Sequence, residues 1–135
     1  MNTNVKFILL LTSLVSLASL GARAEDPIVT KVKRIEVGEY DTLRANTNNV
    51  ILDVRSAAEF EKGRIPGAVN IDINSSKFSE TISALDTNKT YLVNCAVGMR
   101  SAKACQKMEA MGFDHLYDFK PGFDGWKKAG KPVEK

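Results

Sequence analysis

Short apolar runs rich in β-branched residues, separated by helical segments, most constrain what this 135-residue chain can fold into. The runs at 50–54 and 90–94 lack polar alternation, which predicts strands buried on both faces. Strands that alternate with helices indicate an α/β fold, a parallel sheet with helices on both faces. We expect strands at 33–35, 50–54, 68–71, 90–94 and 115–118, and helices at 37–45, 57–61, 76–85, 102–111 and 122–129.

The segment from Cys95 to Ser101 joins one predicted strand to the next helix. A strand, a short glycine-containing loop and a helix N-terminus together present backbone N–H donors to an anion. In this loop the group that the donors surround is the sulfur of Cys95. Backbone amides, the helix dipole and Arg100 all favour its thiolate form, which is the nucleophilic form. Ligands of such sheets bind beyond the carboxyl ends of the strands, where Cys95 falls. The sequence therefore predicts cysteine chemistry in an anion-binding loop.

Within this loop Cys95 is the candidate catalytic residue. Gly98 is interpreted as a position that needs a positive φ or a close approach to the anion. Ser101 is interpreted as the cap of the following helix, with donation to a bound sulfur as the alternative. Arg100 is the only charged side chain of the loop. The candidate substrate-binding residues are Ala96, Val97, Gly98, Met99, Arg100 and Ser101.

Other polar or reactive residues have simpler structural interpretations. Cys105 lies a full turn inside its predicted helix, on an apolar stripe, so we expect a buried thiol and no disulfide to Cys95. Asp53 and Arg55 are candidates for contact with substrate, but Arg55 is expected instead to pair with Glu59 or with loop carbonyls and to fix the turn. His115 is expected to be structural or exposed, and Trp126 to anchor the last helix. Two cysteines and one histidine cannot build a common four-ligand zinc site, so no metal is expected.

Residues 1–24 have the features of a secretory signal peptide. Lys6 precedes an apolar stretch at 7–20, and Ala22-Arg23-Ala24 is a small-x-small cleavage site. The stretch is shorter than the roughly 20 residues of a membrane-spanning helix, so we expect removal rather than anchoring. The mature chain then begins near Glu25, with a lead at 25–32 and one domain at 33–135. Export predicts a periplasmic or secreted protein that has no membrane contact after cleavage.

The charge of the chain does not indicate a nucleic-acid partner. The formal net charge is +3, and cleavage removes Lys6 and Arg23, so that 17 of the 19 basic residues face 16 acidic ones. No block of Lys and Arg of the nucleic-acid-binding type occurs in the sequence.

Four motifs in a fixed order resemble the single-domain rhodaneses, the thiosulfate sulfurtransferase-like proteins. The resemblance spans residues from about 33 to 133, and its motifs are specific as a set. The motifs are Leu52-Asp53-Val54-Arg55 with Glu59-Phe60, Gly63-Arg64-Ile65-Pro66-Gly67-Ala68-Val69-Asn70, Cys95-Ala96-Val97-Gly98-Met99-Arg100-Ser101, and Gly122-Phe123-Asp124-Gly125-Trp126 with Gly130-Lys131-Pro132-Val133.

The resemblance implies a five-stranded parallel sheet and a sulfurtransferase that works through a persulfide on Cys95, without a cofactor. The donor is expected to be thiosulfate or a persulfide, and the acceptor a thiol or cyanide, including a periplasmic thiol protein. One alternative is a sulfur-carrier or protein-binding module with little turnover on free donors. Another is a phosphatase or arsenate reductase, but related enzymes of that kind use a Cys-x5-Arg loop, whereas Cys95 and Arg100 define Cys-x4-Arg.

Overall fold

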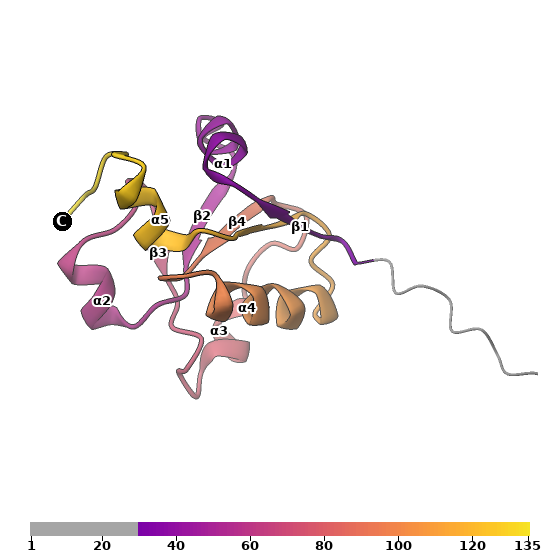
Figure 1. Cartoon of the computed structure of the whole chain (residues 1–135). Helices are drawn as coiled ribbons and strands as arrows, with labels where there is room; N and C mark the ends of the chain where they lie inside the picture. Colours follow the sequence, from indigo (N-terminus) through magenta and orange to yellow (C-terminus); the bar gives the residue numbers. More distant parts are fainter. Residues whose placement is uncertain (1–29) are drawn as a thin grey trace, which may run out of the picture.

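The computed structural model describes residues 30–135; the predicted signal peptide at 1–24 lies outside the described residues. Five strands and five helices alternate along this part of the chain (Figure 1). The strands are β1 (Val32–Ile35), β2 (Val50–Asp53), β3 (Val69–Asn70), β4 (Tyr91–Asn94) and β5 (Leu116–Phe119). The helices are α1 (Val37–Arg44), α2 (Ala57–Lys62), α3 (Phe78–Ser83), α4 (Met99–Ala110) and α5 (Gly122–Lys128).

The strands form one parallel sheet in the order β1-β5-β4-β2-β3. Helices α3 and α4 lie on one face, and α1 and α5 lie on the other (Figure 1). The predicted α/β fold, with five parallel strands covered on both faces, is therefore confirmed. The strand β4 is central, and Cys95 follows it at the carboxyl end of the sheet.

Each face of the sheet has its own hydrophobic core, because successive side chains of a strand point to opposite faces. In β4, Tyr91 and Val93 pack into the core beneath α3 and α4, whereas Leu92 packs into the core beneath α1 and α5. Trp126 is fully buried in the second core, as predicted, and its indole N–H donates to the Pro132 carbonyl at 2.7 Å. The two cores fix β4 from both sides and thus the position at which the loop after it begins.

Some element boundaries differ from the predicted ones. Helix α3 is shorter than 76–85, because turns at Asp72–Ser75 and Ser75–Phe78 take its predicted first residues, and the Ser75 hydroxyl accepts from the Lys77 N–H at 3.2 Å. Strand β1 begins one residue earlier than predicted, and β5 is shifted by one residue toward the C-terminus. Helix α4 begins at Met99, earlier than predicted, with consequences for Ser101 that are described below.

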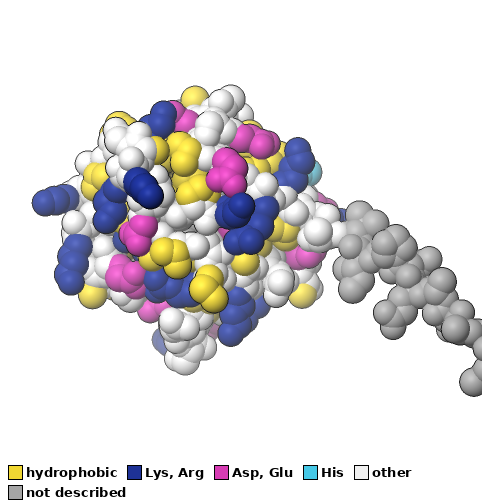
Figure 2. Space-filling view, in the orientation of Figure 1, with side chains coloured by type: hydrophobic (Ala, Val, Ile, Leu, Met, Phe, Trp, Pro, Cys, Tyr) yellow, Lys and Arg dark blue, Asp and Glu magenta, His cyan; other side chains and the backbone are white. Residues whose placement is uncertain are grey.

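The surface of the domain carries charges of both signs. Figure 2 shows Lys and Arg side chains interspersed with acidic and apolar side chains over the face that it presents. In the part of the chain that the structure describes, no helix is long and apolar enough to cross a membrane.

Candidate active site

Cys95 is the first residue of the loop between β4 and α4, and it is fully buried. The Gly98 N–H donates to Sγ of Cys95, with a nitrogen–sulfur distance of 3.2 Å. The Ser101 hydroxyl is also close to the sulfur, at 3.6 Å from Oγ to Sγ. The loop therefore surrounds the sulfur with hydrogen-bonding groups, as the strand-loop-helix pattern predicted.

Two opposing effects set the pKa of the Cys95 thiol. Burial disfavours the charged thiolate and acts to raise the pKa. Hydrogen bonds from the backbone N–H groups of Ser101, Val97 and Gly98 favour the thiolate, and the pKa of Cys95 is lowered from its ordinary value. A lowered pKa makes more of the nucleophilic thiolate available near neutral pH.

Gly98 gives the loop its shape. Its φ is +87°, as predicted, and a Cβ at this position would lie 2.1 Å from the Lys120 carbonyl oxygen. Because the chain turns this sharply, α4 begins directly after Gly98 at Met99. The prediction that Ser101 caps the helix is therefore wrong: Ser101 is the third helical residue, and its hydroxyl donates to Asp118 Oδ1 at 2.6 Å.

The N-terminus of α5 holds the outer side of the loop. The Phe123 N–H donates to the Cys95 carbonyl at 2.7 Å, and the Asp124 N–H donates to the Ala96 carbonyl at 3.0 Å. Gly122 makes this approach possible, because its φ is +66° and a Cβ there would lie 2.4 Å from the Ala96 carbonyl oxygen. With these carbonyls bound by α5, the loop can direct N–H groups toward the sulfur.

Arg100 is tied to α2. Its guanidinium donates to both carboxylate oxygens of Glu59, at 2.8 and 2.9 Å. Glu59 also closes the capping box of α2 with Ser56. This pair lowers the pKa of Glu59 to about 2, chiefly through the Arg100 hydrogen bonds, and raises the pKa of Arg100. Arg100 is thus part of a neutral pair, which the sequence analysis did not foresee.

Arg55 and Asp53 form a second, buried pair. Arg55 donates to both carboxylate oxygens of Asp53, at 2.7 to 3.0 Å, and to the Gly63 carbonyl at 2.8 Å. Of the two expected partners, Glu59 or a loop carbonyl, the structure has the carbonyl, and the Glu59 carboxylate is bound by Arg100 instead. Both members of the pair are almost fully buried, so their contacts fix the turn after β2.

The rim of the loop is apolar and open. The side chains of Val97 and Met99 are 59 % and 78 % exposed, and Ala96 is half-buried. Ala96 also lines a pocket of about 380 Å³ beside the loop. The basic residues of this pocket are Arg55, Lys62, Lys127 and Lys135, and its acidic residues are Glu59 and Asp124.

Two residues that the sequence left outside the site remain outside it. His115 is exposed and bonds through its carbonyl to the Tyr91 N–H, at the amino end of β4, whereas Cys95 lies at the carboxyl end. Cys105 is a residue of α4 and is fully buried in the core that α3 and α4 cover, and burial raises the pKa of its thiol. Over residues 30–135, no three His, Cys, Asp or Glu side chains form a cluster that could hold a metal ion.

The sequence analysis missed Asp118 and Arg34. They lie opposite one another on β5 and β1, and Arg34 Nε donates to Asp118 Oδ2 at 2.8 Å. Arg34 also donates to the Gly98 carbonyl at 3.0 Å, and Asp118 accepts from Ser101. A signal for Asp118 was present: an acidic residue in an apolar strand demands a buried partner.

This architecture and this loop agree with the comparisons with known proteins. Residues 36–129 match the family model of the rhodanese-like domain, and the chain belongs to that family. The chain is 33 % identical over 87 residues to the thiosulfate sulfurtransferase GlpE of Actinobacillus succinogenes, which covers 64 % of this chain and 77 % of that protein. It is 28 % identical over 101 residues to the protein of that name from Shewanella oneidensis, covering 75 % and 98 %.

Solved structures show the same fold. A rhodanese-related protein from Thermoplasma volcanium superposes with a TM-score of 0.64 at 31 % identity, over 76 % of this chain and 97 % of that one. A rhodanese-like domain protein from Staphylococcus aureus superposes with a TM-score of 0.61 at 28 % identity, over 76 % and 99 %.

Proposed function

We propose that this protein is an exported sulfurtransferase that moves sulfane sulfur from a donor to a thiophilic acceptor through a persulfide on Cys95. The observation that carries the proposal is the Gly98 N–H at 3.2 Å from Cys95 Sγ, within a loop whose hydrogen bonds lower the pKa of that thiol. Family membership and the thiosulfate sulfurtransferases among the relatives support the same activity.

The proposed reaction consists of two displacements at sulfur. The Cys95 thiolate attacks the outer sulfur of thiosulfate, the sulfur–sulfur bond of the donor breaks, and sulfite leaves with the bonding electron pair. Cys95 then carries a persulfide, Cys–S–S⁻. A thiolate or cyanide attacks the terminal sulfur, and the Cys95 thiolate leaves with the electron pair of that bond. Because the thiolate and the terminal persulfide sulfur are both anions, the loop amides can stabilise each in turn.

The charges around the loop bear on the choice of donor. We propose that Ala96, Val97, Gly98, Met99, Arg100 and Ser101 bind it. Arg100 is neutralised by Glu59, so the N–H groups carry most of the anion binding at the sulfur itself. The basic residues of the neighbouring pocket can attract an anionic donor such as thiosulfate, whereas the apolar rim suits a less polar persulfide. Acceptors of matching chemistry are cyanide and thiols, including a periplasmic thiol protein.

A second candidate is a sulfur carrier that is loaded and discharged by proteins and turns over free donors slowly. It is favoured by the exposed Val97 and Met99, which a protein partner could cover. A phosphatase or arsenate reductase is a weaker candidate, because Arg100 holds Glu59 instead of facing an oxyanion above Cys95.

Intact mass of the purified protein before and after thiosulfate treatment tests the proposal. We expect a gain of one sulfur atom that cyanide reverses, with release of thiocyanate. Cys95→Ser should lose both the gain and the release, whereas Cys105→Ala, the matched control, should keep both. No gain of sulfur on wild-type protein would refute both sulfur-transfer hypotheses. Fast turnover then supports the enzyme, and slow turnover supports the carrier.

Export is part of the proposal and rests on residues 1–24. We expect the mature protein to begin at or near Glu25 and to occur in the periplasm or outside the cell. N-terminal sequencing of protein from its native source tests this. A chain that retains Met1 and sediments with membranes would contradict export.

A further inference from the structure

The Ser101 hydroxyl lies between two groups that can each accept its hydrogen. Oγ is 2.6 Å from Asp118 Oδ1 and 3.6 Å from Cys95 Sγ. A serine hydroxyl has one hydrogen to donate. The shorter contact is a charge-assisted O–H···O bond of ordinary length, which assigns the hydrogen to Asp118. Toward the sulfur, Ser101 then presents a lone pair, which can accept the S–H hydrogen of the Cys95 thiol.

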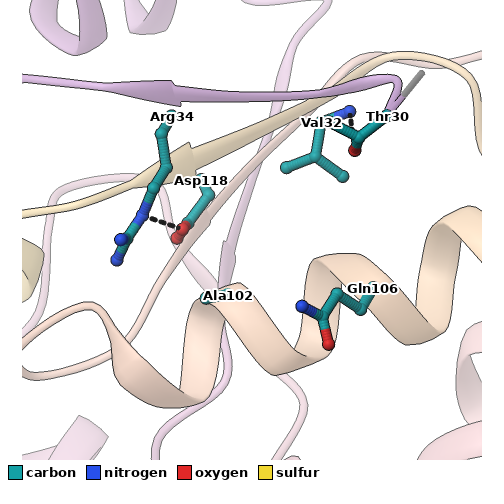
Figure 3. A pocket seen from close by; sticks show the side chains of 6 residues that line it. All are labelled: Thr30, Val32, Arg34, Ala102, Gln106 and Asp118. Atoms are coloured by element: carbon teal, nitrogen blue, oxygen red, sulfur yellow. Dashed lines mark hydrogen bonds and ion pairs between the residues drawn. The ribbon is translucent and has the colours of Figure 1, made fainter. Parts of the chain in front are cut away.

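Asp118 is built to hold this hydrogen. The residue is 1 % exposed, and its other carboxylate oxygen accepts from Arg34 Nε at 2.8 Å (Figure 3). Each oxygen of this buried side chain therefore has a hydrogen-bond donor, one of them a guanidinium. Arg34 and Asp118 line a pocket of about 370 Å³. Figure 3 shows the two side chains between β1 and α4.

We propose that Asp118 is a positioning residue of the sulfur site. Asp118 accepts the hydrogen bond from the single hydroxyl hydrogen of Ser101, so that this hydrogen is not donated to the Cys95 sulfur. Only the effect of Asp118 on catalysis rests on the proposed function. The hydrogen-bond arrangement itself concerns the thiol and thiolate forms of Cys95, whatever reaction they serve.

The consequence differs between the two protonation states. In the thiol state every hydrogen has an acceptor: Cys95 S–H donates to Ser101, and Ser101 donates to Asp118. When the thiol proton leaves to solvent, the thiolate gains no hydroxyl hydrogen bond unless Ser101 turns away from Asp118. The backbone N–H groups of the loop, among them that of Gly98 at 3.2 Å, must then stabilise the thiolate.

This arrangement gives less Cys95 thiolate at a given pH, but each thiolate is more nucleophilic. The nucleophilicity of a thiolate falls as its pKa falls, so a further hydrogen bond on the sulfur would increase the amount of thiolate but weaken its attack. The same holds for the terminal sulfur of a persulfide that lies in the loop. Asp118 therefore sets the balance between the amount of Cys95 thiolate and the nucleophilicity of that thiolate.

Asp118→Asn separates the hydrogen-bond effect from simple packing. The carbonyl of the introduced amide would accept from Arg34, and its NH₂ group would donate to Ser101 Oγ. The Ser101 hydrogen would then be free to turn to Cys95. The charged groups that face this site, and that remain in the variant, are Arg34 of β1, Arg100 of α4 with Glu59 of α2, and Asp72 after β3.

The test titrates Cys95 by the ultraviolet absorbance of its thiolate, in a Cys105→Ala background so that one thiol reports. For Asp118→Asn we expect the midpoint to move to lower pH. The thiolate fraction below the midpoint should rise roughly tenfold, the worth of one hydrogen bond to a charged group. Asp114→Asn, which removes an exposed carboxylate beyond the other end of β5, is the matched control and should not move the midpoint. An unchanged or raised midpoint in Asp118→Asn overturns the proposal.

Ser101→Ala keeps the proposal falsifiable if Asp118→Asn does not fold. Because Asp118 holds the Ser101 hydrogen, deletion of the hydroxyl should leave the midpoint unchanged or slightly lower. A rise in the midpoint would show that the hydroxyl donates to the thiolate in the native protein, which overturns the proposal.

Activity adds a second readout that depends on the proposed function. The pH profile of kcat/KM for thiosulfate in Asp118→Asn should shift to lower pH, with a plateau reduced roughly threefold by the weaker nucleophile. A shifted titration midpoint in a protein that never gains sulfur would refute the proposed function and leave the role of Asp118 intact. A shifted midpoint with an unshifted activity profile would overturn that role in catalysis.

Discussion

Glu59 and Arg100 join the first turn of α2 to the first turn of α4 through two parallel hydrogen bonds of 2.8 and 2.9 Å. The two residues are 41 positions apart in the chain. Glu59 serves two structures at once, since the same side chain closes the capping box with Ser56. The pair holds a guanidinium near the Cys95 loop and cancels its charge there, so the loop is anchored without becoming strongly positive.

Glu59→Gln tests this cancellation. A glutamine can still accept from the Ser56 N–H, so the helix cap should persist. The positive charge of Arg100 is then no longer neutralised by a carboxylate. We expect kcat/KM for thiosulfate to rise by roughly 1.4- to fivefold, from the 0.2–1 kcal/mol typical of partly exposed pairs. The rise should shrink at high salt. Glu61→Gln, on the same helix, is the control; an equal rise there would indicate a general charge effect instead.

Arg100→Met should have the opposite effect. The variant leaves the Glu59 carboxylate unpaired beside the loop, so the site becomes more negative and the pKa of Cys95 should rise. We expect kcat/KM for thiosulfate to fall on the order of tenfold, with a smaller loss for an uncharged sulfane-sulfur donor. In the double variant with Glu59→Gln, part of the loss should be recovered. Equal losses for both donors, without recovery, would mean that Arg100 only holds the loop together.

The same pair predicts a dependence of stability on pH. Arg100 lowers the pKa of Glu59 from 4.5 to about 2 in the folded protein. The contribution of this carboxylate is therefore fully present above about 4.5 and declines as the pH falls toward about 2, because only the unfolded chain takes up the proton in that window. Glu59 is partly exposed, so we expect a loss of less than about 1 kcal/mol. Denaturant unfolding across this range should show a flatter curve for Glu59→Gln; parallel curves would contradict the assignment.

The fold could be predicted from the sequence because its signals are local. The β-branched runs mark the central strands, and the loop at 95–101 could be placed at a strand end from its neighbours alone. The pairs that tune the loop could not be predicted in this way. Arg34 and Asp118 are 84 positions apart, and they meet only because β1 pairs with β5. Arg55 likewise had two carboxylates within reach, Asp53 and Glu59, and only the position of Arg100 decides between them.

Cys105→Ala should leave sulfur transfer unchanged. The thiol is fully buried in the core beneath α3 and α4, and its raised pKa keeps it neutral. Deletion of one buried heavy atom should lower the free energy of unfolding by about 1 kcal/mol. Initial rates and denaturant midpoints, measured together, check both expectations. A variant of normal stability that cannot release sulfur would make Cys105 a resolving thiol and the chemistry a thiol oxidation.

Gly98→Ala should disable the loop by two separable effects. The φ of +87° is unfavourable for any residue with a Cβ, and the added Cβ would lie 2.1 Å from the Lys120 carbonyl oxygen. Gly112 offers the matched control, since its φ is +94° but a Cβ there meets nothing within 4 Å. We expect Gly112→Ala to lose on the order of 1 kcal/mol of stability and to keep its activity. Gly98→Ala should lose on the order of 3 kcal/mol and most of its rate, because the N–H that faces Cys95 moves with the backbone. Equal losses of stability in the two variants, with activity retained in both, would show that the loop can yield to Lys120 without disturbing the sulfur.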